Sequence, residues 1–224
     1  MEYRNFKSKR QHAIREINKI YILKAAEEIF AQKGYGLTTM DEIAEKSQLS
    51  KPTIYHYFES KSDIFFEIIL NSFNEVEQKL IEIKKKPKSA VEKVKEIINF
   101  IFSFYSQKKN ISRIFLTEKS LVKRVYNLIP RGEPFVSERD IKFLDDIKNR
   151  AKRIYRIMAE ILQEGIDSGE FREMNVMDAC YILDALLHGF FFKRFWLDKK
   201  YSYAKSADLI QTFFLLGIIR EAKE

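Results

Sequence analysis

The feature that most constrains the fold is helical spacing of apolar residues over nearly the whole chain, with little punctuation between segments. Only seven Gly and four Pro occur among 224 residues, which leaves room for long helices and argues against a turn-rich β protein. No alternating strand pattern and no internal repeat is present. We therefore expect an all-α protein with about nine helices.

The composition is that of a globular protein with a basic balance. Hydrophobic residues make up 46% of the chain and charged residues 32%, which excludes a disordered chain. The formal net charge of +8 favours an anionic partner such as nucleic acid. A single cysteine excludes a disulfide framework and fits a reducing compartment. The N-terminus lacks a signal-like apolar region, and the apolar runs are shorter than the roughly 18 residues that span a bilayer. We expect a cytoplasmic protein without a membrane partner.

The first 15 residues form a polar arm with five basic side chains and one acidic side chain. The basic residues are Arg4, Lys7, Lys9, Arg10 and Arg15. Two interpretations stay open here: a solvated, frayed terminus, and an arm that contacts DNA. From Ile17 onward, apolar residues recur at helical spacing until Gly34 supplies a stop.

A short helix is expected after this stop. Thr38 or Thr39 can cap its N-terminus, and Asp41 and Glu42 lie in its first turn, where acids are favoured. It ends near Ser47, and the stretch SQLS then makes a tight break.

A third helix is expected from Lys51 to Phe58, with Ser50 as its cap and Pro52 in its first turn, where a missing N–H costs nothing. Ile54 and Phe58 form its core face. The other face is polar and aromatic and carries Lys51, Thr53, Tyr55, His56 and Tyr57.

Three short helices with a four-residue break between the second and third predict a helix-turn-helix, whose third helix lies in the DNA major groove. Lys51 supplies charge for a phosphate or a guanine edge, and Thr53 and Tyr55 offer hydroxyls to phosphate oxygens. His56 can donate to a base edge or a phosphate. Residues 1–63 hold 11 Lys and Arg against 9 Asp and Glu, so the basic side chains must gather on one face.

The stretch AAEEIFAQKGYGLTTMDEIAEKSQLSKPTIYHYFESKSDIFFEII resembles the DNA-binding domain of the TetR family of transcriptional regulators. The match covers about Ile17 to Leu70, across four helices. The resemblance implies that eight residues face DNA, with Lys61 meeting phosphate: Thr39, Ser50, Lys51, Pro52, Thr53, Tyr55, His56 and Lys61. It also implies a DNA-binding domain over residues 1–64 and an effector-binding and dimerisation domain over residues 65–224.

The sequence departs from the family pattern at Gln48, where the family usually has Gly. If this position requires a positive φ, a residue with a side chain costs on the order of 1 kcal/mol there. We expect tertiary packing to absorb this cost.

Further helices are expected beyond residue 60. One of these helices starts at a capping box formed by Ser89 and Glu92. The others run from about Ser60 to Lys85, Ile111 to Leu128, Glu138 to Asp167, Val176 to Leu197 and Ala204 to Ala222. The last two are apolar on nearly all sides, which requires covering on all sides. The family resemblance implies that these two helices form a homodimer by packing as a four-helix bundle. The expected interface residues are Phe191, Phe195, Phe213, Leu216 and Gly217.

Aromatic residues are abundant in the second half, where most are expected in the core. The remainder suggests an apolar pocket for a lipophilic or aromatic effector. The candidate effector residues are Phe102, Tyr105, Phe115, Tyr126, Tyr155 and His188.

Cys180, Asp184 and His188 are spaced four apart on one ridge of a helix. A helical span of eight residues puts Cys180 and His188 about 12 Å apart, too far for a direct hydrogen bond. We expect a local pair of Asp184 and His188, with Cys180 as a core residue. No metal, cofactor or catalytic motif is present, so an enzyme is not expected.

The sequence therefore predicts a homodimeric regulator, most simply a repressor, that binds a palindromic duplex operator and is released by a small effector. Two other classes stay open: a helical module that binds a protein through the same face, and an α-helical enzyme that uses the pocket.

Overall fold

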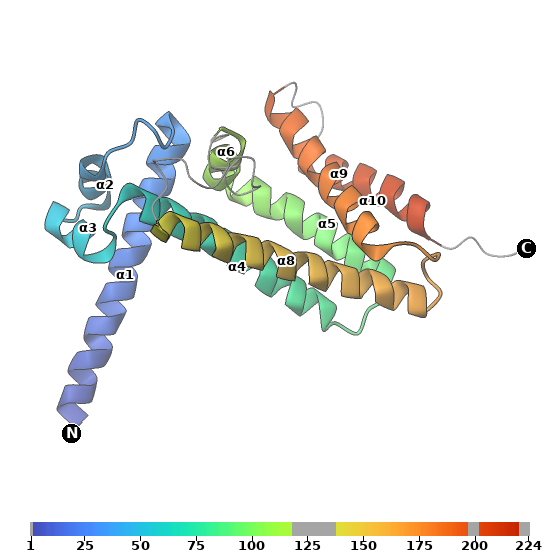
Figure 1. The fold of residues 1–224 in the computed structure, drawn as a ribbon, viewed down its shortest axis with the longest axis horizontal. Helices are drawn as coiled ribbons and strands as arrows, with labels where there is room; N and C mark the ends of the chain where they lie inside the picture. Colours follow the sequence, from blue (N-terminus) through green and yellow to red (C-terminus); the bar gives the residue numbers. More distant parts are fainter. Residues whose placement is uncertain (1, 118–137, 197–201, 220–224) are drawn as a thin grey trace, which may run out of the picture. The chain divides into compact units, whose positions relative to one another are not determined.

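The computed structural model describes residues 2–117, 138–196 and 202–219 of the chain. These residues form helices joined by short loops, with one isolated bridge between Phe171 and Ile219, so the all-α prediction is confirmed (Figure 1). The helices are α1 (Glu2–Lys33), α2 (Met40–Ser47), α3 (Lys51–Tyr57), α4 (Lys61–Lys84), α5 (Ala90–Gln107), α6 (Lys109–Thr117), α8 (Glu138–Asp167), α9 (Val176–Trp196) and α10 (Tyr203–Ile218).

Helix starts follow the predicted caps. Thr39 accepts from the backbone N–H of Glu42, whose carboxylate accepts from the N–H of Thr39 in return. Ser89 and Glu92 form the same reciprocal capping box at the start of α5. At the end of α1, Gly34 adopts φ 87°, a left-handed conformation in which glycine carries no steric penalty.

Two helix boundaries differ from the prediction. The polar arm is not frayed: α1 begins at Glu2 instead of Ile17, and the basic residues 9–15 lie on this continuous helix. Helix α10 ends at Ile218 instead of Ala222, because Ile219 already has an extended backbone. The predicted extension of α6 to Leu128 lies outside the described residues.

The chain forms two compact units, and each is described by itself. The first comprises residues 1–72 and 110–147, and the second comprises residues 73–109 and 148–224. In the first unit α1 packs on α2 and α2 on α3. Its buried side chains include Ile22, Phe30, Ile43 and Ile54.

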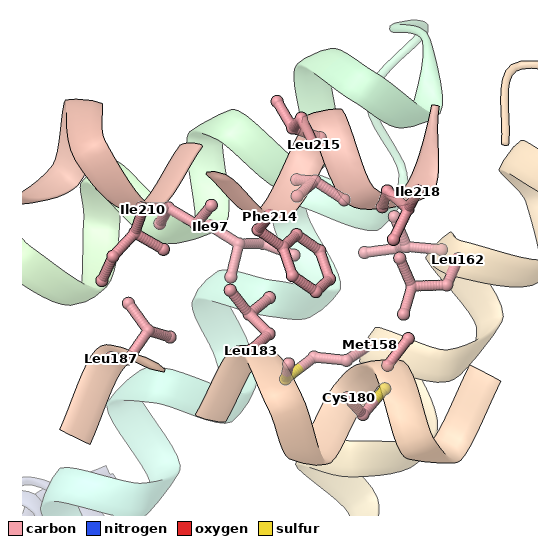
Figure 2. Packing of buried hydrophobic residues seen from close by; sticks show 14 of the residues in the cluster. Ile97, Met158, Leu162, Cys180, Leu183, Leu187, Ile210, Phe214, Leu215 and Ile218 are labelled. Atoms are coloured by element: carbon pink, nitrogen blue, oxygen red, sulfur yellow. The ribbon is translucent and has the colours of Figure 1, made fainter. Parts of the chain in front are cut away.

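The second unit has a core built from the C-terminal part of α4 together with α5, α8, α9 and α10 (Figure 2). Phe214 of α10 lies among Ile97 of α5, Leu183 of α9 and Met158 of α8. The packing is close where α8 ends: a Cβ atom added at Gly165 would lie 2.1 Å from a ring carbon of Phe171.

Among the described residues, no helix is long and apolar enough to cross a membrane.

Candidate nucleic-acid interface

Helix α3 is held by a cap at its start and by two buried side chains. The Ser50 hydroxyl accepts from the backbone N–H of Thr53 at 3.3 Å, and the two hydroxyl oxygens lie 2.7 Å apart. Pro52 occupies the first turn, as the sequence predicts. Ile54 is fully buried and Phe58 nearly so. These contacts fix which face of α3 remains outside.

That outer face is polar and accessible. Lys51 and His56 are exposed, and the Tyr55 ring is 45% exposed, which is high for a large aromatic side chain. Tyr57 is half-buried, and its hydroxyl accepts from the side-chain amide of Asn18 in α1 at 3.1 Å. The structure therefore brings Lys51, Tyr55 and His56 together on one short exposed surface.

The turn between α2 and α3 contains the expected departure. Gln48 has φ 58° and ψ 31°, the only positive φ outside glycine among the described residues. Its backbone N–H bonds to the carbonyls of Ala44 and Glu45, and the N–H of Leu49 bonds to the Ala44 carbonyl at 3.1 Å. These bonds close α2 in the manner of a left-handed C-cap. They hold Gln48 in the conformation that its side chain disfavours.

The lysines of this region are engaged within the chain. Lys51 lies 2.7 Å from the carboxylate of Asp41, and this hydrogen bond raises the pKa of Lys51. Lys61 donates to the carbonyls of Tyr35 at 2.6 Å and Thr38 at 2.7 Å. A phosphate that binds Lys51 must therefore displace the Asp41 carboxylate. Lys61 holds the loop before α2 through its bonds to the two carbonyls. Contact of either lysine with phosphate stays a prediction.

Thr39 is exposed and takes part in the capping box described above. Its partner Glu42 also accepts from Lys33. The Lys33 hydrogen bond first, and the Thr39 backbone and side-chain bonds after it, lower the pKa of Glu42 to about 2. The Thr39 hydroxyl stays accessible at the helix start, where an anion is favoured.

The predicted effector residues that the structure describes make different contacts, and their role in binding an effector stays a prediction. Phe102 belongs to the buried core of the second unit. The Tyr105 ring stacks on Phe191 at 4.3 Å, and Tyr155 makes an edge contact with Tyr181 at 5.3 Å. The side chain of Phe115 and all of Tyr126 lie outside the described residues.

The predicted dimer residues fall into two groups. Phe213 and Leu216 are 69% and 74% exposed on α10, and nothing lies within 4 Å of a Cβ atom added at Gly217. Phe191 is instead 6% exposed, covered by its own chain. The Phe195 side chain lies outside the described residues.

Cys180, Asp184 and His188 behave as the spacing predicts. His188 pairs with Asp184 at 3.1 Å, and this hydrogen bond raises the pKa of His188. Cys180 is fully buried, and burial raises the pKa of its thiol to about 12. A buried protonated thiol is not a nucleophile. The described residues contain no group of three or more His, Cys, Asp or Glu that could hold a metal ion.

Two partners of the α3 surface could not be found by sequence reasoning. Asp41 binds Lys51 across the turn, and Asn18 holds Tyr57 across 39 residues. Neither pairing has a periodic signal, because both depend on how α1 and α2 pack against α3.

Two family models match the sequence. The model described as bacterial regulatory proteins, tetR family, matches residues 22–68, which include α2 and α3. The model described as QacR-like protein, C-terminal region, matches residues 133–219. Both the helix-turn-helix and the C-terminal helices thus agree with bacterial regulators.

Individual relatives agree with the two models. The Fatty acid metabolism regulator protein of Bacillus subtilis is 26% identical over 152 residues, 68% of this chain and 70% of the relative. An uncharacterized HTH-type regulator of the same organism, YhgD, is 34% identical over 94 residues, 42% of this chain and about half (49%) of that relative. The crystal structure of the regulator FadR from Bacillus subtilis, in complex with stearoyl-CoA, matches with a TM-score of 0.69 and 23% identity. That match covers 89% of this chain and 98% of the other, and it shows that the fold is shared.

Proposed function

The chain belongs to the TetR family of bacterial regulatory proteins, and on that premise we propose that it is a ligand-responsive repressor that binds a palindromic operator as a homodimer. The observation that carries the proposal is the exposed face of α3. Lys51, Tyr55 and His56 lie on this face, while the buried Ile54 holds the opposite face against the rest of the unit. A short capped helix with a polar outer face fits the major groove.

The roles within this face follow from side-chain chemistry. The hydroxyls of Thr53 and Tyr55 donate to phosphate oxygens, and Lys51 adds charge once it exchanges Asp41 for a phosphate. His56 donates to a base edge or to a phosphate. Thr39, Ser50 and Lys61 position the ends of α2, α3 and α4 against the backbone of the duplex.

The first experiment is selection of sequences from a random duplex pool by the purified protein. Enrichment of an inverted repeat is expected, with half-sites about one DNA turn, roughly 34 Å, apart. Tyr55→Ala and Lys51→Ala are expected to lose operator binding while they melt at the wild-type temperature. A folded, ligand-free dimer that enriches no sequence would refute the proposal and favour a protein partner for the same face.

We place the dimer interface on the exposed apolar face of α10. Phe213, Leu216 and Gly217 share one side of this helix, and two large apolar side chains this exposed require a cover. The absence of neighbours at Gly217 permits close approach of a second helix. Leu216→Glu is expected to yield monomers in sedimentation and to weaken operator binding. Ile141→Glu, the same change at an exposed apolar residue of α8, is the control and should leave dimers intact.

The effector we propose is lipophilic, with a long-chain acyl-CoA as the first candidate. One similar protein is named Fatty acid metabolism regulator protein, and one similar structure is the regulator FadR in complex with stearoyl-CoA. Stearoyl-CoA is expected to release the protein from its operator, because a ligand that prefers the unbound conformation shifts the population away from DNA. Coenzyme A alone is the control. Release by both, or by neither, would contradict an acyl-chain effector.

A further inference from the structure

The first unit contains a polar groove outside the helix-turn-helix itself. Its lining comes from two helices: Gln11, His12, Ile14 and Arg15 of α1, and His56 and Tyr57 of α3, around a volume of about 450 Å3. The N-terminal part of α1 that forms one wall continues beyond α2 and α3 (Figure 1). The groove therefore begins where the exposed face of α3 ends.

All the side chains that line this groove, except the apolar Ile14, can donate hydrogen bonds. Arg15 offers a guanidinium, Gln11 an amide, and His12 and His56 ring N–H groups. Tyr57 already accepts from Asn18, so its O–H proton remains to be donated elsewhere. No carboxylate is among the six lining residues. Donors that converge without an acid suit an anion.

The charges of the first unit point to the same place. Within the described residues, Lys19, Lys33, Lys46 and Lys51 each pair with a carboxylate of their own unit. Lys61 is held by backbone carbonyls.

The basic side chains of the α1 extension differ from these lysines. Lys9, Arg10 and Arg15 are exposed and pair with no described acid. Cations that need not leave a partner are the ones that gain most from binding phosphate.

We infer that the groove between the N-terminal part of α1 and the end of α3 binds a backbone phosphate of duplex DNA, with Arg15 as its charged group. The inference rests on the proposed function, since the phosphate is the one that follows the bases facing α3. His56 is shared: it belongs both to the exposed face of α3 and to the lining of the groove. A duplex seated on α3 thus reaches Arg15 and Gln11 by extending past His56.

The test measures operator affinity of the full-length protein over a series of KCl concentrations, for wild type and variants. Each subunit of the proposed dimer contributes one Arg15, so Arg15→Gln is expected to weaken operator binding about a hundredfold near 0.1 M salt and to reduce the salt slope by about two. The loss should be equal on the operator and on unrelated duplex, because a phosphate contact carries no sequence information. Arg15→Lys, which keeps the charge, should retain the wild-type slope.

Lys24→Gln is the matched control. Lys24 is exposed on the same helix, and nine residues of helix place it on the side opposite Arg15. Lys24→Gln removes the same charge as Arg15→Gln and should leave the salt slope at the wild-type value. Equal effects of Arg15→Gln and Lys24→Gln would overturn the inference and reduce it to overall charge.

The two failures are distinguishable. If Tyr55→Ala loses the operator while Arg15→Gln binds as wild type, the groove is not a phosphate site but the proposed function stands. If the wild-type protein binds no duplex at any salt, both are overturned.

Discussion

Gly165 is the position at which a single added methyl group should do most damage to the second unit. A Cβ atom there would lie 2.1 and 2.3 Å from two ring carbons of Phe171, and 2.8 Å from the Cβ of Ala90. Phe171 cannot retreat easily, because its backbone N–H bonds to the Gly165 carbonyl at 2.9 Å and the next N–H, of Arg172, bonds to Ile218 at 2.9 Å. Gly165→Ala therefore forces the ring, which is 2% exposed, out of its site.

The magnitude follows from three opposing contributions. Displacing the Phe171 ring loses up to about 1.5–3 kcal/mol of burial. The residual overpacking against Ala90 costs about 1–3 kcal/mol. Alanine regains about 1 kcal/mol over glycine in a helix interior. The net expectation is a loss of about 1.5–5 kcal/mol in the free energy of unfolding.

Urea unfolding followed by far-UV circular dichroism measures this loss, with a double-mutant cycle as the control. Phe171→Leu alone should destabilise, since it shrinks a buried side chain. In the Gly165→Ala background it should cost much less or even stabilise, because the smaller side chain relieves the clash. A neutral Gly165→Ala, or strictly additive changes, would refute the packing argument.

Three further predictions concern other sites. Gln48→Gly should stabilise the turn by about 0.5–1 kcal/mol, because glycine removes the cost of a left-handed residue and gives back only part of it as chain entropy. Slower hydrogen exchange in α2 would measure this gain, and Gln48→Ala should show none. Glu77→Gln should lower the free energy of unfolding in urea by about 1–3 kcal/mol. The buried carboxylate of Glu77 accepts from Arg153 at 2.5 Å, and a neutral amide in its place cannot form this ion pair. Because the folded pKa of Glu42 is depressed to about 2, its stabilisation is present above its ordinary value of 4.5 and lost as pH falls between the two; Glu42→Gln should remove that part of the pH dependence.

Local signals in the sequence were sufficient for the caps and for the face of α3. Ser50, Thr39 and Ser89 cap helices because a hydroxyl meets an N–H only three residues away, a relation that the sequence displays directly. The spacing of Ile54 and Phe58 likewise fixed the inward face of α3, and both are buried. The positive φ of Gln48 was predictable only because the resemblance marked that position.

Relations between distant residues were not predictable in this way. The close packing of Phe171 on Gly165 depends on a loop that folds back on α8. The Glu170 carboxylate accepts from the N–H groups of Ala90 and Val91, some 80 residues away. The polar arm was the other difference: it has no apolar stripe, yet it continues α1 as a helix. A helix already nucleated extends at little further cost, so the start of α1 is not marked by apolar residues.

The distribution of partners also shows which basic side chains of the DNA-binding region are engaged within the fold. Residues 1–63 carry 11 basic and 9 acidic side chains, a small excess of positive charge for a region proposed to bind a polyanion. Three of those acids are paired with lysines of the same region: Glu28 with Lys46, Glu42 with Lys33 and Asp41 with Lys51. Lys9, Arg10 and Arg15, on the N-terminal part of α1, are basic side chains outside these pairs. In the proposed complex, α3 then supplies hydroxyl and imidazole donors that read position and sequence, and α1 supplies the salt-dependent attraction, so that the two properties can be altered separately by substitution.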